Sequence, residues 1–294
     1  MKRTIKVGTR KSELAMVQTN MIIEALRQID RELDFEILPI STTGDEILDK
    51  PLIEFGGKGV FVAEFEVALL NGRIDLAVHS AKDMPMQLPS GLGIVGIPKR
   101  EDPRDVLITM KQDLNQDKNC IIGTSSLRRQ FQIEQFYQVE CKSIRGNVPT
   151  RLRKLSDGEY DGIILAAAGL KRLGLDDTKQ FHFRYFSTEE FVPAGGQGIL
   201  AVEGRVEDEL TETVYRINDF NTAICLETER KVLQLLNAGC HEAIGVFSYI
   251  QEGNIYINAI YDVGGKLQRV QDYSTVNENT ALAMRVAKKL DSFA

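Results

Sequence analysis

Two stretches of the chain share one pattern and decide the fold: V-G-T-R-K-S-E-L-A at residues 7–15 and I-G-T-S-S-L-R-R at residues 122–129. Each runs from a short apolar segment through Gly-Thr to a serine, which a helical pattern follows. Alternation of strands and helices is typical of mostly parallel sheets that are covered by helices. The repeated pattern therefore predicts two similar α/β lobes.

The hydrophobic periodicity around these stretches extends both lobes. In the first lobe we expect strands at 4–8, 35–40 and 74–78 and helices at 12–29 and 60–70. In the second lobe we expect strands at 120–123, 139–144 and 163–165 and helices at 126–137, 149–155 and 166–173.

The pattern changes after Pro193. P-A-G-G-Q-G at 193–198 indicates a hinge or a tight turn, and a strand at 199–203 could return to the first lobe. Further on, we expect a long helix at 219–236, strands at 244–250, 255–261 and 267–273, and a closing helix at 278–290. Gly253-Asn254 and Gly264-Gly265 are hairpin-turn signals between these strands. This part is predicted to be a separate antiparallel α+β domain.

A polar segment with a proline, R-E-D-P-R at 100–104, indicates a crossover between domains. We therefore expect a first domain at 1–99, to which 198–217 returns. The second domain is expected at 100–197 and the third at 218–294.

The composition narrows the class of protein. The chain has 294 residues, 43% of them apolar, and 36 Lys and Arg against 42 Asp and Glu give a net charge of −6. An acidic chain disfavours nucleic acid as a partner. No apolar run reaches the ~18 residues of a membrane span, and the first ten residues lack the apolar segment of a secretory signal. The four cysteines form no C-x-x-C pair, so neither a zinc site nor a disulfide framework is expected. The sequence thus favours a cytoplasmic protein without a metal.

The loop H-S-A-K-D-M-P at 79–85 follows a predicted buried strand, where α/β sheets place groups that contact ligands. It sets Asp83 beside Lys82. A carboxylate held there could move protons or stabilise a nearby cation. The alternative is an aspartate that only caps a helix or a turn.

Cations gather in the predicted second lobe. Residues 142–154 hold five Lys and Arg and no acid. Arg128 and Arg129 fall in the first turn of a predicted helix, where the helix dipole disfavours cations. Arg10 and Lys11 occupy the matching place in the first lobe. The pattern favours a cleft that binds a small polyanion, while a solvated basic face is the alternative.

Two further glycine-rich segments and one cysteine have separate interpretations. G-L-G-I-V-G at 91–96 matches a dinucleotide fingerprint by letter, but no helix is expected after it. G-G-K-G-V-F at 56–61 lacks P-loop spacing and indicates a lid that carries Lys58.

Cys240, in N-A-G-C-H-E-A, lies between a predicted helix and a predicted strand. It is either a buried small residue or a reachable thiol that could hold a covalent group.

Taken together, the motifs resemble the porphobilinogen deaminase (hydroxymethylbilane synthase) family. In order, they are T-R-K-S-x-L-A, T-x-G-D, G-G-K-G-x-F, A-V-H-S-x-K-D-x-P, G-T-S-S-L-R-R, I-R-G-N-V-x-T-R-L, A-A-A-G-L-K-R-L-G and P-A-x-G-Q-G. The resemblance spans about residues 6–245. It implies an α/β fold with two lobes like those of periplasmic binding proteins, with mixed, mostly parallel sheets. A small C-terminal α+β domain with a three-stranded antiparallel sheet completes it.

The resemblance also implies a reaction. A dipyrromethane cofactor would be joined by a thioether to Cys240, and four porphobilinogen units would be added head to tail with release of ammonia. Hydrolysis would then release hydroxymethylbilane. Family members are expected to act as cytoplasmic monomers on a small-molecule substrate, with no nucleic acid or membrane partner.

The motifs carry functional residues over to this chain. Asp83 would be the catalytic carboxylate, with Lys82 beside it. The residues that would bind the cofactor are Cys240, Asp83, Lys82, Ser80, Thr124, Ser126, Arg128, Arg129, Arg145 and Gly146. The residues that would bind substrate are Arg10, Ser12, Arg145, Arg151, Arg172, Gln197, Lys58 and Phe61.

The chain departs from the family pattern around the cysteine. It has Ala238, His241, Glu242 and Ala243 where G-G-C-Q-V-P is usual, and Glu242 adds an anion beside a polyanionic cofactor. Two alternatives to the active enzyme follow. One is a non-enzymatic two-lobed protein that binds anions, and the other is an inactive member of the family.

Overall fold

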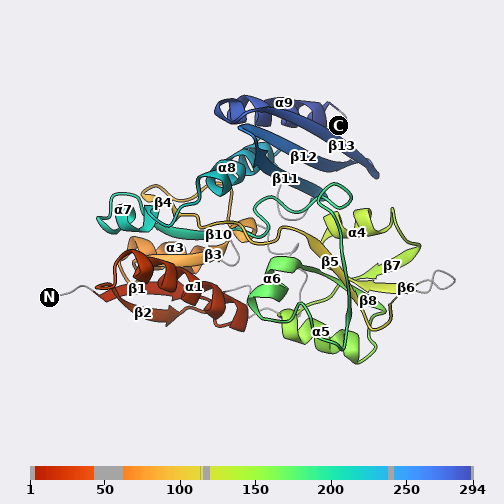
Figure 1. Cartoon of the computed structure of the whole chain (residues 1–294), viewed down its shortest axis with the longest axis horizontal. Coiled ribbons are helices and arrows are strands. Elements are labelled where there is room, and N and C mark those ends of the chain that lie inside the picture. The colour runs from red at the N-terminus through yellow and green to blue at the C-terminus, as the bar shows by residue number, and fades with distance from the viewer. Residues whose placement is uncertain (1–3, 43–61, 113, 115–119, 238–241, 293–294) are drawn as a thin grey trace. The chain divides into compact units, whose positions relative to one another are not determined.

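The computed structural model describes residues 4–42, 62–112, 114, 120–237 and 242–292 (Figure 1). The chain divides into two compact units. One comprises Met1–Glu101 and Ile199–Leu226, and the other Asp102–Gly198 and Glu227–Ala294. Within the described ranges, no helix combines the length and the apolar character that crossing a bilayer requires.

The first unit is built on a five-stranded sheet of order β2-β1-β3-β10-β4. β1 is parallel to β2 and β3, whereas β10 is antiparallel to β3 and β4. The strands are β1 Thr4–Thr9, β2 Asp34–Pro39, β3 Leu76–Ser80, β4 Leu92–Gly96 and β10 Leu200–Arg205. The helices are α1 Glu13–Ile29, α3 Ala63–Leu70 and α7 Leu210–Tyr215.

Local chemistry explains how the first strand and helix meet. The Ser12 side chain accepts a hydrogen bond from the Ala15 N–H at 3.3 Å and so caps the start of α1. The buried face of α1 then places Ile22 and Leu26 against Val7 of β1, within one apolar cluster. The apolar periodicity that predicted this helix is therefore the face that packs on the sheet.

The second unit has a five-stranded sheet of order β7-β6-β8-β5-β9. β6 is parallel to β7 and β8, and β5 is antiparallel to β8 and β9. The strands are β5 Asp105–Thr109, β6 Cys120–Gly123, β7 Val139–Lys142, β8 Gly162–Ala166 and β9 His182–Tyr185. The helices are α4 Leu127–Ile133, α5 Val148–Ser156 and α6 Ala167–Arg172. In each sheet, three neighbouring strands are parallel, and two further strands pair antiparallel beside them. The predicted pair of similar α/β lobes is therefore confirmed.

The C-terminal part of the chain forms a separate three-stranded antiparallel sheet of order β11-β12-β13, with α9 lying along it (Figure 1). Its elements are α8 Phe220–Leu235, β11 Ile244–Gln251, β12 Asn254–Val263, β13 Lys266–Thr275 and α9 Asn279–Asp291. The predicted fold class, including this sheet, is confirmed.

Some local predictions need correction. The first hairpin turn lies at Glu252-Gly253, both with positive φ (50° and 77°), one residue before the predicted pair. Two consecutive positive φ angles define the turn that matches strand twist. G-L-G-I-V-G at 91–96 contains strand β4, and β5 and β9 were not expected from the pattern.

Candidate active site

The loop that carries Asp83 is a rigid turn at the end of β3. Residues Ala81–Asp83 form a short 3-10 helix, and the Ala81 N–H donates to the Ile199 carbonyl at 3.0 Å. Ala81 and Met84 are buried in one cluster with Ile199, whereas Asp83 between them is exposed. Buried neighbours on both sides fix the backbone, so the Asp83 carboxylate is presented to solvent from a fixed position.

The other predicted residues of the first unit lie at the same sheet edge. β1 and β3 are parallel neighbours, so Arg10 and Ser12 follow β1 at the edge where Ser80 ends β3 and Lys82 follows it. The Gln18 side chain on α1 donates to the Ser80 hydroxyl at 3.1 Å and joins the two ends. The structure therefore brings these predicted residues together around one edge.

In the second unit, Arg128 and Arg129 converge on one carboxylate, Asp105 at the start of β5. Arg128 Nη1 lies 2.7 Å from Asp105 Oδ2, and Arg129 donates to Oδ1 from Nη2 at 2.7 Å and from Nε at 2.9 Å. Asp105 is fully buried, and 4% of Arg128 and 8% of Arg129 is exposed. Burial lowers the pKa of the Arg128 guanidinium, and the adjacent Asp105 opposes that effect.

This arginine cluster, defined here as Arg128, Arg129 and Asp105, retains positive charge because two guanidinium groups share one carboxylate. Arg129 also donates to the Ile164 carbonyl from Nη1 at 2.9 Å, so each of its three nitrogens is used. Arg128 makes both of its hydrogen bonds, to Asp105 and to the Val192 carbonyl, through Nη1. Toward the described residues, its Nε and Nη2 donate no hydrogen bond. That edge has the geometry to hold a carboxylate through two donors.

Gln197, predicted to bind substrate, also belongs to this region. Its side-chain nitrogen donates to the Pro103 carbonyl at 2.8 Å and to Asp105 Oδ1 at 3.1 Å, and the residue is fully buried. Its observed contacts therefore support the cluster. Arg172 Nη2 donates to the Gly198 carbonyl at 2.7 Å, immediately after Gln197 in the chain.

Thr124 and Ser126 shape the turn before α4. The buried Thr124 hydroxyl accepts the Ser126 N–H at 3.2 Å, and the Ser126 carbonyl accepts from the Arg129 N–H at 3.0 Å. This turn directs both arginine side chains inward from the first helical turn.

Arg145 and Arg151 flank the start of α5 and are half-buried. Arg151 Nε donates to the Gly146 carbonyl at 2.8 Å. Gly146 has a φ of 113°, and a Cβ there would lie 2.7 Å from Thr150 Cγ2, so the turn requires glycine. The structure thus brings both arginines to one turn.

Three predicted residues, Lys58, Phe61 and Cys240, lie outside the described residues. Near the last of them, Glu242 Oε2 accepts from the Tyr261 hydroxyl at 3.0 Å. The extra anion noted in the sequence therefore has a partner on β12.

Among the buried acids that sequence reasoning missed are Asp105 and Glu229. A signal existed for each. Asp105 leads directly into the apolar run V-L-I-T, and Glu229 follows Leu226 at the i+3 spacing of a buried helix face. A charged residue at a position predicted to be buried indicates a specific partner.

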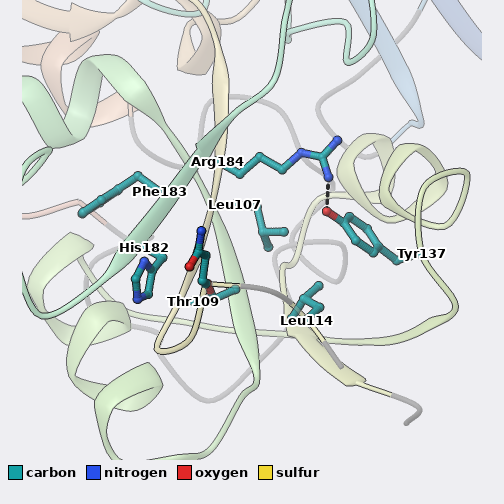
Figure 2. Close-up of a pocket in the computed structure, with 8 residues that line it drawn as sticks. Leu107, Thr109, Leu114, Tyr137, His182, Phe183 and Arg184 are labelled. Carbon is teal, nitrogen blue, oxygen red and sulfur yellow. Dashed lines mark hydrogen bonds between the residues drawn. The ribbon is translucent and has the colours of Figure 1, made fainter. Parts of the chain in front are cut away.

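A cavity of about 360 Å³ in the second unit lies elsewhere (Figure 2). In this cavity Arg184 of β9 points to the Tyr137 hydroxyl, to which it donates a hydrogen bond. The lining residues are Leu107, Thr109, Gln112, Leu114, Tyr137, His182, Phe183 and Arg184. None of the predicted site residues is among them.

These features define a multi-domain α/β protein with cationic and carboxylate groups at its sheet edges. A profile of the porphobilinogen deaminase dipyromethane cofactor binding domain matches residues 5–213, and one of the porphobilinogen deaminase C-terminal domain matches residues 223–292. The chain belongs to the porphobilinogen deaminase family. The predicted family, enzyme class and dipyrromethane cofactor are confirmed at that level.

The chain is similar to several known proteins, and two curated relatives agree with the family assignment. The chain is 42% identical to the porphobilinogen deaminase of Acetivibrio thermocellus over 288 residues, which are 97% of each chain. It is 48% identical to the porphobilinogen deaminase of a Geobacillus strain over 254 residues, 85% of this chain and 81% of that protein. Among solved structures, the BenM effector binding domain aligns with a TM-score of 0.43 at 14% identity, over 73% of this chain and 91% of that one.

Proposed function

We propose that this chain is a hydroxymethylbilane synthase. It joins four porphobilinogen molecules head to tail, each with loss of ammonia, on a dipyrromethane attached to Cys240, and hydrolysis then releases the product. The observation that carries the proposal is the exposed Asp83 carboxylate, held on a turn whose neighbours Ala81 and Met84 are buried. It lies within the family's own motif, in a chain that matches both family domains.

Asp83 acts as the catalytic carboxylate. Loss of ammonia from the aminomethyl group of porphobilinogen leaves a cationic carbon, and a fixed carboxylate stabilises that charge and accepts the proton lost later. A preorganised group in this role contributes about 10²–10⁴-fold in rate. Lys82, next to it on the same turn, pairs with a substrate carboxylate.

The arginines hold the acetate and propionate groups. When bound, the dipyrromethane would supply the free pyrrole carbon for the first addition, and each later unit would be joined to the terminal pyrrole of the growing chain. Every pyrrole carries two carboxylates, so cationic residues must outnumber the acids that pair with them. The arginine cluster meets this requirement, because its two guanidinium groups share Asp105. Arg10, Arg145, Arg151 and Arg172 add further cations for the growing chain.

We also propose that the enzyme works as a cytoplasmic monomer. Its partner is a small-molecule substrate, with no role for nucleic acid or a membrane. The net charge of −6 supports the exclusion of nucleic acid, since an acidic surface repels a polyanion.

The substitution Asp83→Asn tests the proposal. We expect kcat for porphobilinogen consumption to fall at least about 100-fold, while intact mass still shows two added pyrrole units. The matched control is Asp157→Asn, an exposed aspartate at the end of α5, which should keep wild-type kcat. Near-normal turnover of Asp83→Asn would remove Asp83 from the mechanism. A wild-type chain that carries no pyrrole and consumes no porphobilinogen would refute the function itself.

A further inference from the structure

Glu229 on α8 is a fully buried carboxylate that accepts hydrogen bonds from Gly196 and Ser248. Its Oε2 accepts the Gly196 N–H at 2.7 Å. Its Oε1 accepts the Ser248 N–H at 2.8 Å and the Ser248 hydroxyl at 3.0 Å. Burying a carboxylate is costly unless such donors compensate it, so these bonds help to hold Glu229 in place.

The groups joined at Glu229 come from three places in the chain. Glu229 belongs to α8, Ser248 to β11, and Gly196 to the glycine-rich turn after Pro193. α8 ends at Leu235 and β11 begins at Ile244, so Cys240 lies in the short connection between them. Glu229 therefore ties together both elements that flank the cysteine.

Two glycines let the segment 192–196 approach these elements closely. A Cβ on Gly195 would lie 2.8 Å from Leu233 Cδ1 on α8. A Cβ on Gly245 of β11 would lie 2.8 Å from the Val192 carbonyl oxygen. The Val246 N–H also donates to the Pro193 carbonyl at 3.0 Å. The segment thus contacts both α8 and β11 through its backbone.

The same segment contacts the arginine cluster. The Val192 carbonyl accepts from Arg128 Nη1 at 2.7 Å, and Gln197 donates to Asp105 at 3.1 Å. Residues 192–197 therefore hydrogen-bond both to the arginine cluster and to Glu229, and so connect the two.

We propose that Glu229 is a positioning residue for the cofactor. By fixing the Gly196 turn to α8 and β11, it sets the ends of the connection that carries Cys240 at a defined place relative to Arg128 and Arg129. The inference rests on the proposed function, in which Cys240 holds the dipyrromethane and the arginines bind its carboxylates. Carboxylates on a tethered group reach their donors only if the tether is correctly placed, and small displacements are costly.

The junction requires a carboxylate. Both oxygens of Glu229 receive a backbone N–H, so each must be an acceptor. In Glu229→Gln, which has nearly the same shape, the new amide N–H₂ would face the N–H of either Gly196 or Ser248. One contact would become donor against donor, and the turn would move relative to α8 or β11.

The experiment follows covalent loading in the full chain. Apoprotein from cells that cannot make porphobilinogen is incubated with porphobilinogen, and intact mass records the gain of two pyrrole units with time. The assay temperature lies well below the thermal midpoint of the variant. We expect Glu229→Gln to load at least about 10-fold more slowly than wild type, because the tether is misplaced. Glu227→Gln makes the same chemical change at an exposed position on the same helix and should load at the wild-type rate.

A second control separates positioning from loss of stability. Val232→Ala removes a fully buried side chain from the same helix and should lower the thermal midpoint, but it removes none of the groups that hydrogen-bond at Glu229. We expect it to load at the wild-type rate. If Glu229→Gln loads at the wild-type rate, the inference is overturned. It is also overturned if Val232→Ala loads as slowly as Glu229→Gln when the two variants have a similar decrease in thermal midpoint. A wild-type chain that gains no mass would overturn the proposed function, and this inference with it.

Discussion

Replacing Asp105 with asparagine removes the anion on which two buried guanidinium groups depend. In the native chain, Asp105 Oδ1 accepts from Arg129 Nε, Arg129 Nη2 and Gln197, and Oδ2 accepts from Arg128 Nη1, all within 2.7–3.1 Å. The substitution Asp105→Asn keeps the shape of the side chain but removes its charge. It also points an amide N–H₂ at one of the donors. Both arginines would then remain buried without a compensating charge.

The size of the effect follows from the burial of the pair. Removing one partner of a buried ion pair costs about 3–5 kcal/mol of unfolding free energy, because the remaining charge stays desolvated. For a domain of this size, 1 kcal/mol lowers the melting temperature by roughly 2–4 °C. We therefore expect Asp105→Asn to melt roughly 6–20 °C below wild type.

The chain has no tryptophan, so unfolding is best followed by far-UV circular dichroism in urea and on heating. The control is Asp102→Asn, three residues earlier, where the partners Arg104 and Lys171 are 41% and 36% exposed. It should lose about 1 kcal/mol, since exposed partners keep their water. A loss below about 1 kcal/mol for Asp105→Asn would refute the view that Asp105 is the counter-charge of the arginine cluster.

Two further predictions rest on pKa shifts. Burial tends to raise the pKa of Asp102, but its hydrogen bonds with Arg104 and Lys171 outweigh that effect and bring it to about 2. Because the native pKa lies below the unfolded value of about 3.9, the stabilisation is complete above that value and is lost as the pH falls through about 2. Urea unfolding of wild type and Asp102→Asn should therefore differ near neutral pH and converge as the medium is acidified through that native pKa, and a constant difference would contradict the assignment. Burial, with Glu134 nearby, raises the pKa of the Cys141 thiol to about 11. At about pH 8 iodoacetamide should label it on the order of 100-fold more slowly than an ordinary thiol of pKa about 8.5, as followed by peptide mapping, and labelling at the ordinary rate would exclude the shift.

The parallel part of each lobe could be predicted because each strand leads directly into an amphipathic helix. Ser12 and the apolar face of α1 mark one such unit, and I-G-T-S-S-L marks the other. The antiparallel strand β9 gave a weaker signal, whereas the apolar run of β5 was a signal that the prediction missed. β9 is four residues long and alternates between exposed and half-buried positions, so its pattern resembles a loop. Its place in the sheet comes from pairing with β5, which residues 182–185 do not reveal by themselves.

The site shows a similar division between what local sequence specifies and what the fold supplies. The sequence places Arg128 and Arg129 in a first helical turn, where the dipole disfavours them, and so predicts a counter-charge. It does not show which acid provides it, because Asp105 is 23 residues from Arg128 along the chain and meets the arginines only through β5. The folded chain supplies one counter-charge internally, Asp105, while the bound polyanion that the sequence favours stays a prediction.

That internal partner changes how the two arginines divide their work. Arg129 donates from Nε, Nη1 and Nη2 to Asp105 and the Ile164 carbonyl, so each nitrogen of its guanidinium makes one hydrogen bond within the fold. Arg128 uses only Nη1, for Asp105 and the Val192 carbonyl. The two residues are adjacent and equally charged, yet of the two only Arg128 has neighbouring nitrogens, Nε and Nη2, that donate no hydrogen bond to the described residues. Because a carboxylate is held best by such an edge, we expect Arg128 to make the direct hydrogen bonds to a ligand carboxylate, and Arg129 to hold Asp105 in place while it adds positive charge to the cluster.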